Sequence, residues 1–126
     1  MTASAHAREL LHFAAVAADS KAGEDLVALD VSGPLPLTDV FLLVSGNSER
    51  NVIAISDAVE DALNDAGQKT LRREGKEQGR WVLLDFGDLV VHVFHQEDRQ
   101  YYSLERLWRD CPVVPFELPN AAVANS

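Results

Sequence analysis

Two of the four histidines and the single cysteine of this chain are candidates for binding a metal ion or acting as a nucleophile. His92 and His95 lie three positions apart in an apolar stretch that reads as a strand. Side chains at positions i and i+3 of a strand point to opposite faces, so the two imidazoles cannot close on one ion. Cys111 precedes Pro112 and has no histidine near it in the sequence, which argues against a nucleophilic role. We therefore expect no metal, no cofactor and no catalytic cysteine.

A second possible chemistry is nucleotidyl transfer. Ser-Gly-Asn-Ser at 45–48 follows an apolar stretch and is similar to the glycine–serine turn that opens such a site. These sites also need two carboxylates one residue apart on a strand, so that both can hold Mg²⁺. No Asp-x-Asp or Asp-x-Glu lies on an expected strand, and Asp85 and Asp88 are three apart across a turn. The loop is present without its metal ligands, which favours a binding module over a small nucleotidyltransferase-like enzyme.

The most distinctive segment, residues 79–94, reads as two apolar strands joined by a tight turn at 86–87. Strand alternation places Trp81, Leu83 and Asp85 on one face and the positions between them on the other. Asp85 should lie near water at the turn, so Trp81 falls on the less covered face, where an aromatic side chain can anchor a protein interface. The alternative is that Trp81 belongs to the core, since Leu83 beside it is apolar.

Four further residues are candidates for contacts with a partner. Asp39 precedes an apolar strand, where its carboxylate can cap the turn or pair with a basic partner. Arg50 stands in the first turn of a helix, where the helix dipole is unfavourable for a cation. Either a carboxylate, Asp39 or Asp85, pairs with it, or its side chain is exposed to solvent. Tyr101 and Tyr102 are adjacent on an expected helix and point in different directions, so one can be core and the other surface.

These residues need an α/β scaffold, which the hydrophobic pattern predicts. Period-3.6 spacing and capping residues indicate helices at 5–22, from 47 or 48 to 67, and at 101–108. Short apolar runs indicate strands at 26–29, 41–44 and 70–73 and in the hairpin, with a polar loop at 75–79. We expect a single mixed sheet with helices packed on it. Residues 1–111 would form the domain, and 112–126 an extended tail, disordered from residue 120.

Composition limits the class of protein and of partner. The chain has 126 residues, enough for one core. It carries 11 Lys and Arg against 20 Asp and Glu, a net charge of −9. This charge argues against direct DNA or general nucleic-acid binding and suits a partner with a basic surface. The single cysteine excludes an internal disulfide, and we find neither a signal peptide nor an apolar run long enough to cross a membrane, so a cytoplasmic location is expected.

Several separated motifs resemble the ribosome silencing factor family, also called Iojap-like ribosomal silencing factors. They are the stretch 21–30, Leu-Thr-Asp at 37–39, Ser-Gly-Asn-Ser at 45–48, Gly-Arg-Trp at 79–81, and the tyrosine-to-tryptophan ending at 102–108. The resemblance covers residues 8–111. The chain departs from the family pattern in the long apolar tail after Cys111.

This resemblance implies a nucleotidyltransferase-like fold without catalytic carboxylates, and no enzymatic activity. It implies binding to the large ribosomal subunit through large-subunit ribosomal protein fourteen, which blocks subunit joining and represses translation under nutrient limitation, and a homodimer when free. An acidic dimeric adaptor protein unrelated to ribosomes is a further alternative. The residues expected to bind the partner are Trp81, Leu83, Asp39, Asp85, Arg50, Tyr101 and Tyr102.

Overall fold

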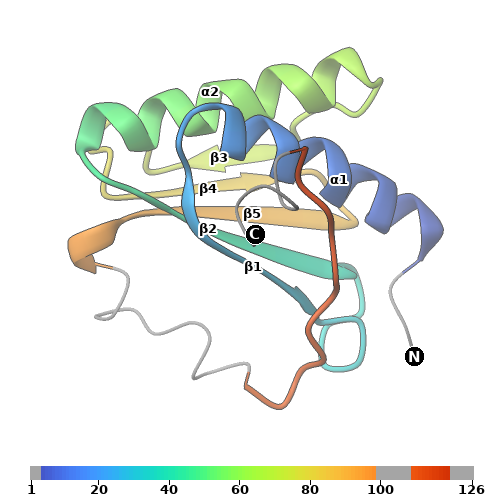
Figure 1. Cartoon of the computed structure of the whole chain (residues 1–126). Coiled ribbons are helices and arrows are strands. Elements are labelled where there is room, and N and C mark those ends of the chain that lie inside the picture. Colours follow the sequence, from blue (N-terminus) through green and yellow to red (C-terminus); the bar gives the residue numbers. More distant parts are fainter. Residues whose placement is uncertain (1–3, 99–108, 120–126) are drawn as a thin grey trace.

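The computed structural model describes residues 4–98 and 109–119. Its helices and strands form a five-stranded mixed sheet with two long helices on one face (Figure 1). In chain order they are α1 (Ala5–Ser20), β1 (Glu24–Asp30), β2 (Val40–Gly46), α2 (Glu49–Asp65), β3 (Arg72–Glu74), β4 (Trp81–Asp85) and β5 (Leu89–His95). The α/β class with helices packed on one mixed sheet is confirmed. The helix expected at 101–108 lies outside the described residues.

Both helices begin at a serine cap and bury one stripe of apolar side chains. The Ser4 hydroxyl accepts a hydrogen bond from the Ala7 N–H, and the Ser48 hydroxyl accepts one from the Asn51 N–H. Each cap satisfies a backbone donor that has no partner inside the helix. The stripe of α2 is fully buried at Val52, Ile55, Val59 and Leu63. The sequence prediction of both helices is therefore confirmed, and the predicted ends differ from the observed ends by at most about two residues.

The sheet order is β1-β2-β5-β4-β3. β2 and β5 run parallel, and every other neighbouring pair is antiparallel. The chain leaves β2, crosses over through α2 to the far edge at β3, and then returns through β4 to place β5 beside β2. All seven residues of β2 are buried, as expected for a strand covered on both faces.

The hairpin of β4 and β5 turns where the sequence predicts. The Phe86 N–H donates to the Leu89 carbonyl oxygen over 2.9 Å, and Gly87 adopts a φ of +91°, a conformation that glycine accepts without strain. Phe86 is fully buried with Val82 and Leu84 under the helices. Trp81 and Leu83 lie on the opposite face and are half-buried.

One strand differs from its sequence prediction. The run 70–73 was expected to be extended, but β3 contains only Arg72–Glu74, which pair with the second half of β4. Thr70 instead directs its hydroxyl to the carboxylate of Glu60 on α2, 3.0 Å away. The next residue already meets β4, because the Leu71 N–H donates to the Asp85 carbonyl oxygen over 2.7 Å; the strand therefore begins about two residues later than predicted.

The tail after Cys111 packs along the free edge of β1. The Asp30 N–H donates to the Pro112 carbonyl oxygen over 2.8 Å, and the Val114 N–H donates to the Ala28 carbonyl oxygen over 2.9 Å. Val114 is 4% exposed and belongs to the core under the helices. Figure 1 shows this segment running beside β1 toward α1. The tail thus protects a sheet edge that would otherwise expose unpaired backbone groups, and a domain boundary at residue 111 stays a prediction.

Candidate partner-binding face

The face of the sheet opposite α1 and α2 carries an apolar cluster that becomes polar toward β3. Strand register places the side chains of β1, β2, β5, β4 and β3 in rows across this face. The apolar cluster contains Leu29, Val31, Phe41, Leu43, Val90 and Phe94, with Val27, Leu35, Trp81, Leu83 and Cys111 packed against it. Arg72 and Glu74 of β3 continue the rows and are exposed. The six residues of the cluster are at most 9% exposed, and we call this side of the sheet the second face.

Trp81 lies at the margin of this cluster among other aromatic rings. Its ring centroid is 5.2 Å from that of Phe94 and 6.0 Å from that of His92. Its indole Nε1–H donates a hydrogen bond to Nδ1 of His92 over 3.2 Å. Burial lowers the pKa of His92 to about 4, so this imidazole is neutral at physiological pH and can accept the bond.

A groove of about 230 Å³ opens beside Trp81, lined by Glu74, Gly75, Trp81 and Leu83. Gly75 has a φ of +83°, and a Cβ added there would collide with the carbonyl oxygen of Trp81. The close approach of these two backbones therefore requires glycine. The groove brings together an aromatic side chain, an aliphatic side chain and one exposed carboxylate.

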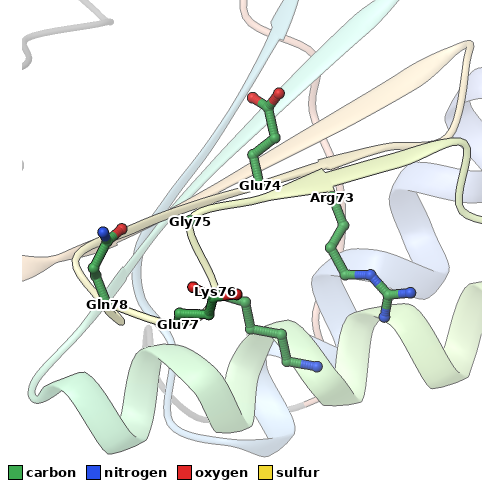
Figure 2. Close-up of a pocket in the computed structure, with 6 residues that line it drawn as sticks. All are labelled: Arg73, Glu74, Gly75, Lys76, Glu77 and Gln78. Carbon is green, nitrogen blue, oxygen red and sulfur yellow. The ribbon is translucent and has the colours of Figure 1, made fainter.

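A larger cavity of about 630 Å³ lies at the turn after β3, lined by Arg73, Glu74, Gly75, Lys76, Glu77 and Gln78. In Figure 2, Arg73 and Lys76 extend toward α2, whereas Glu74 points to the opposite side of the sheet. Arg73 Nη1 is 2.9 Å from the Glu60 carboxylate, and Lys76 forms an ion pair with Asp57. The cations of this cavity are thus paired with α2, and they anchor β3 and its turn.

Arg80, the residue before Trp81, belongs to a network of charges. Its guanidinium binds Asp98 through two hydrogen bonds of 2.8 and 2.9 Å, and it lies 3.7 Å from Glu49. The hydrogen bond to Asp98 raises the pKa of Arg80, and the same bond lowers the pKa of Asp98. This network holds the start of β4, the start of α2 and the chain after β5 together.

Asp39 has a structural role in this chain. Its Oδ2 accepts a hydrogen bond from the backbone N–H of Ser4 over 2.9 Å, which fixes the start of α1. Its own N–H donates to the Asp88 carbonyl oxygen over 3.0 Å. Asp39 and Asp85 therefore lie at one end of the sheet, because Asp85, Val90 and Phe41 are aligned across the strands. Trp81 is aligned with Phe94 at the other end.

Arg50 is exposed in the first turn of α2, at the end of the sheet where Trp81 lies. Asp39 and Asp85 lie at the opposite end, so neither is the carboxylate partner that its helix position suggested, and the expectation of exposure is correct. Asp85 itself uses its Oδ1 to accept a hydrogen bond from the Gly87 N–H over 2.8 Å. Tyr101 and Tyr102 lie outside the described residues.

The described residues hold no cluster of three or more His, Cys, Asp or Glu that could bind a metal ion. Burial, followed by the negative charges of Asp30 and Asp110, raises the pKa of the Cys111 thiol, which makes it a poor nucleophile. Within the same part of the chain, no helix has the length and apolar character needed to cross a membrane.

Comparison with known proteins decides the family. The family model described as "Ribosomal silencing factor during starvation" matches residues 4–126. The chain is 47% identical to the ribosomal silencing factor RsfS of Halalkalibacterium halodurans, over 87% of this chain and 94% of that protein. It is 43% identical to RsfS of Bacillus subtilis, over 87% and 93% of the two chains. The chain belongs to the ribosomal silencing factor family.

The structure agrees with this membership. A crystal structure of a Bacillus halodurans protein superposes with a TM-score of 0.76 at 47% identity, over 85% of this chain and 97% of that one. Ribosomal silencing factors act in translation regulation and are not enzymes. The resemblance read from the sequence motifs and the prediction of a non-enzymatic factor are both confirmed.

In this silencing factor the structure joins Trp81 and Leu83 in one groove, with Asp85 at the far end of the same strand. Sequence reasoning missed Glu74, Gly75 and His92, which surround Trp81, and the Arg80–Asp98 pair beside it. Alternation along β5 places His92 on the same face as Phe94, so the sequence alone could have predicted the face on which His92 lies. The strand pairing that brings β3 and β5 to either side of β4 could not be read from the sequence.

Proposed function

We propose that this silencing factor binds the large ribosomal subunit through large-subunit ribosomal protein fourteen. The bound domain would occupy space that the small subunit needs, and so block subunit joining and repress translation in the cytoplasm under nutrient limitation. Family membership supports the large subunit as target. The observation that carries the contact site is the half-buried Trp81 at the edge of the groove with Leu83 and Glu74.

The proposed contact follows β4. From Trp81 to Asp85 this strand spans about 13 Å at the usual rise per residue, which fits within a standard protein interface. Trp81 and Leu83 would supply the apolar centre, and Asp85 and Asp39 would lie at one polar end. Arg50 stays a proposed contact at its periphery, and Tyr101 and Tyr102, outside the described residues, stay proposed contacts.

A protein partner fits this surface better than ribosomal RNA does. The chain carries a net charge of −9, which repels phosphate and attracts a basic protein. The groove presents the exposed carboxylate of Glu74, whose Oε1 lies 4.0 Å from Arg72 Nε. Electrostatic attraction of this kind would act mainly on the association rate.

We also propose that the free protein is a homodimer, as the family resemblance implies. A dimer formed through the second face would have to dissociate before the ribosome could bind. Light scattering at concentrations on the order of tens of micromolar tests this. A monomer at every concentration would contradict the homodimer while leaving the ribosomal target intact.

Co-sedimentation with purified ribosomal subunits tests the main proposal. We expect the protein to pellet with large subunits and not with small ones, to bind purified large-subunit ribosomal protein fourteen, and to reduce joining of the two subunits in proportion to its occupancy. Equal binding to both subunits would reject it, and binding to neither would reject it and favour an adaptor unrelated to ribosomes. Binding to large subunits but not to purified large-subunit ribosomal protein fourteen would place the contact elsewhere on the large subunit.

A further inference from the structure

His92 is an unusual residue to find inside an apolar cluster. It is 5% exposed, its ring meets Phe41 edge-on at a centroid distance of 4.8 Å, and it stacks on Phe94 at 6.2 Å with an interplanar angle of 13°. An aromatic hydrocarbon ring of similar size would satisfy these contacts. Packing alone therefore gives no reason for an imidazole at this position.

Among the described residues, the imidazole makes one hydrogen bond, and its other nitrogen has no partner. Nδ1 accepts from the indole Nε1–H of Trp81 over 3.2 Å. A neutral imidazole that accepts at Nδ1 carries its proton on Nε2. Nε2 is buried and has no hydrogen-bond partner in the described part of the chain. A buried donor without a partner destabilises a fold, so this histidine carries a cost that its one hydrogen bond must offset.

The hydrogen bond to Trp81 explains why an imidazole is present at position 92. Trp81 stands on β4 and His92 on β5, and the register pairs Trp81 with Phe94 and His92 with Leu83, so the bond runs diagonally between the two strands. It restricts rotation of the indole about its side-chain bonds on the edge of the groove. A side chain that is already held in place loses less entropy when a partner binds.

We propose that His92 is a positioning residue: through Nδ1 it holds the Trp81 indole in the orientation that meets the partner, and for that purpose the fold tolerates an Nε2–H that has no partner among residues 4–98 and 109–119. This inference rests on the function proposed above. It predicts that replacing His92 by phenylalanine weakens the affinity without lowering the stability, which a purely structural histidine would not show.

Two substitutions separate the roles. His92→Phe keeps a ring and removes both nitrogens, so we expect a melting temperature equal to or above that of the wild type and an affinity for large subunits reduced about five- to tenfold. His92→Asn keeps an acceptor near the position of Nδ1 but leaves a cavity, so we expect a lower melting temperature and an affinity closer to wild type than that of His92→Phe.

Nuclear magnetic resonance of the free protein tests the bond without any partner. We expect the Trp81 indole proton, assigned by its absence in Trp81→Phe, to exchange with water more slowly in the wild type than in His92→Phe. The ¹⁵N shifts of His92 should show Nδ1 unprotonated and Nε2 protonated. Equal exchange rates, or a proton on Nδ1, would overturn the inference.

Trp81→Ala distinguishes failure of this inference from failure of the proposed function. If Trp81→Ala loses binding and folded His92→Phe binds like the wild type, His92 does not position the indole, although the proposed contact stands. If folded Trp81→Ala also binds like the wild type, the contact face is wrong and the inference falls with it. If His92→Phe fails to fold, the imidazole is needed for the fold itself, and the inference is rejected unless His92→Asn retains the affinity.

Discussion

Arg80 binds the carboxylate of Asp98 through two hydrogen bonds, from Nε over 2.8 Å and from Nη2 over 2.9 Å. This fork geometry is specific to arginine, because a lysine ammonium offers only a point charge. The pair ties the chain just beyond β5 to the residue just before Trp81. The two ends of the β4–β5 hairpin are thus held together beside the proposed contact.

Replacing Arg80 should change the titration of Asp98. The Arg80 hydrogen bond is the main cause of the lowered pKa of Asp98, so Arg80→Ala should return that pKa toward its ordinary value, and Arg80→Lys should do so in part. The ¹³C shift of the Asp98 carboxyl against pH measures both. Because the folded pKa lies below the unfolded one, the pair stabilises the protein above the unfolded pKa, and this contribution is lost as pH falls through the folded pKa. An unchanged Asp98 titration in Arg80→Ala would contradict this account.

His92 should make the protein less stable in mild acid. Its pKa is lowered from 6.5 to about 4 by burial, so between these values the unfolded chain binds a proton that the folded protein does not. Stability from this source is therefore present above pH 6.5 and is lost as pH falls toward 4, by at most about 3 kcal/mol. Denaturant unfolding of wild type and His92→Phe at a series of pH values measures it. Parallel curves for the two proteins would show that His92 does not titrate in this way.

Gly75 should tolerate alanine far less well than Gly67 does. Both have a positive φ, of +83° and +91°, but a Cβ at Gly67 has no atom within 4 Å, whereas one at Gly75 collides with the Trp81 carbonyl oxygen. Gly67→Ala should cost about 1–2 kcal/mol of unfolding free energy, from backbone strain alone. Gly75→Ala should cost clearly more and also weaken binding, because β4 must move. Equal losses of stability in the two variants would show that the close approach does not matter.

Removing the Trp81 side chain should weaken binding to large subunits. A tryptophan at the centre of an interface contributes about 2 kcal/mol or more, roughly a thirtyfold change in affinity. The control is Leu37→Ala, since Leu37 is 84% exposed in the loop between β1 and β2, away from the groove, and should bind within about twofold of the wild type. Circular dichroism confirms that each variant is folded. A folded Trp81→Ala with wild-type affinity would exclude this residue as an anchor.

The tail should contribute to stability. A chain that ends after Cys111 loses the Val113–Leu29 bridge and the buried side chain of Val114. Burial of one valine stabilises a fold by about 1.5–3 kcal/mol, so we expect a loss of at least that size in urea unfolding. A chain that ends after residue 119 keeps all these contacts and serves as the matched control. If both truncations unfold at the same urea concentration, the tail does not stabilise the domain.

The amino-acid sequence by itself determined the local structure of this protein and the faces of its elements. The stripe of α2 from Val52 to Leu63 and the Ser48 cap follow from the helical period and from the needs of the first turn. The turn at Phe86–Gly87 and the alternation that separates Trp81 from Val82 follow from strand geometry. Each of these properties depends on residues only a few positions apart.

Only the tertiary structure decided which distant residues meet. Trp81 and His92 are 11 positions apart, Arg80 and Asp98 are 18 apart, and Ser4 and Asp39 are 35 apart. Their contacts depend on the placement of β5 between β2 and β4, which no local pattern specifies, because every apolar strand satisfies the same alternation beside any neighbour. The sequence therefore identified Trp81 as a candidate, and the strand order supplied the groove and the histidine that surround it.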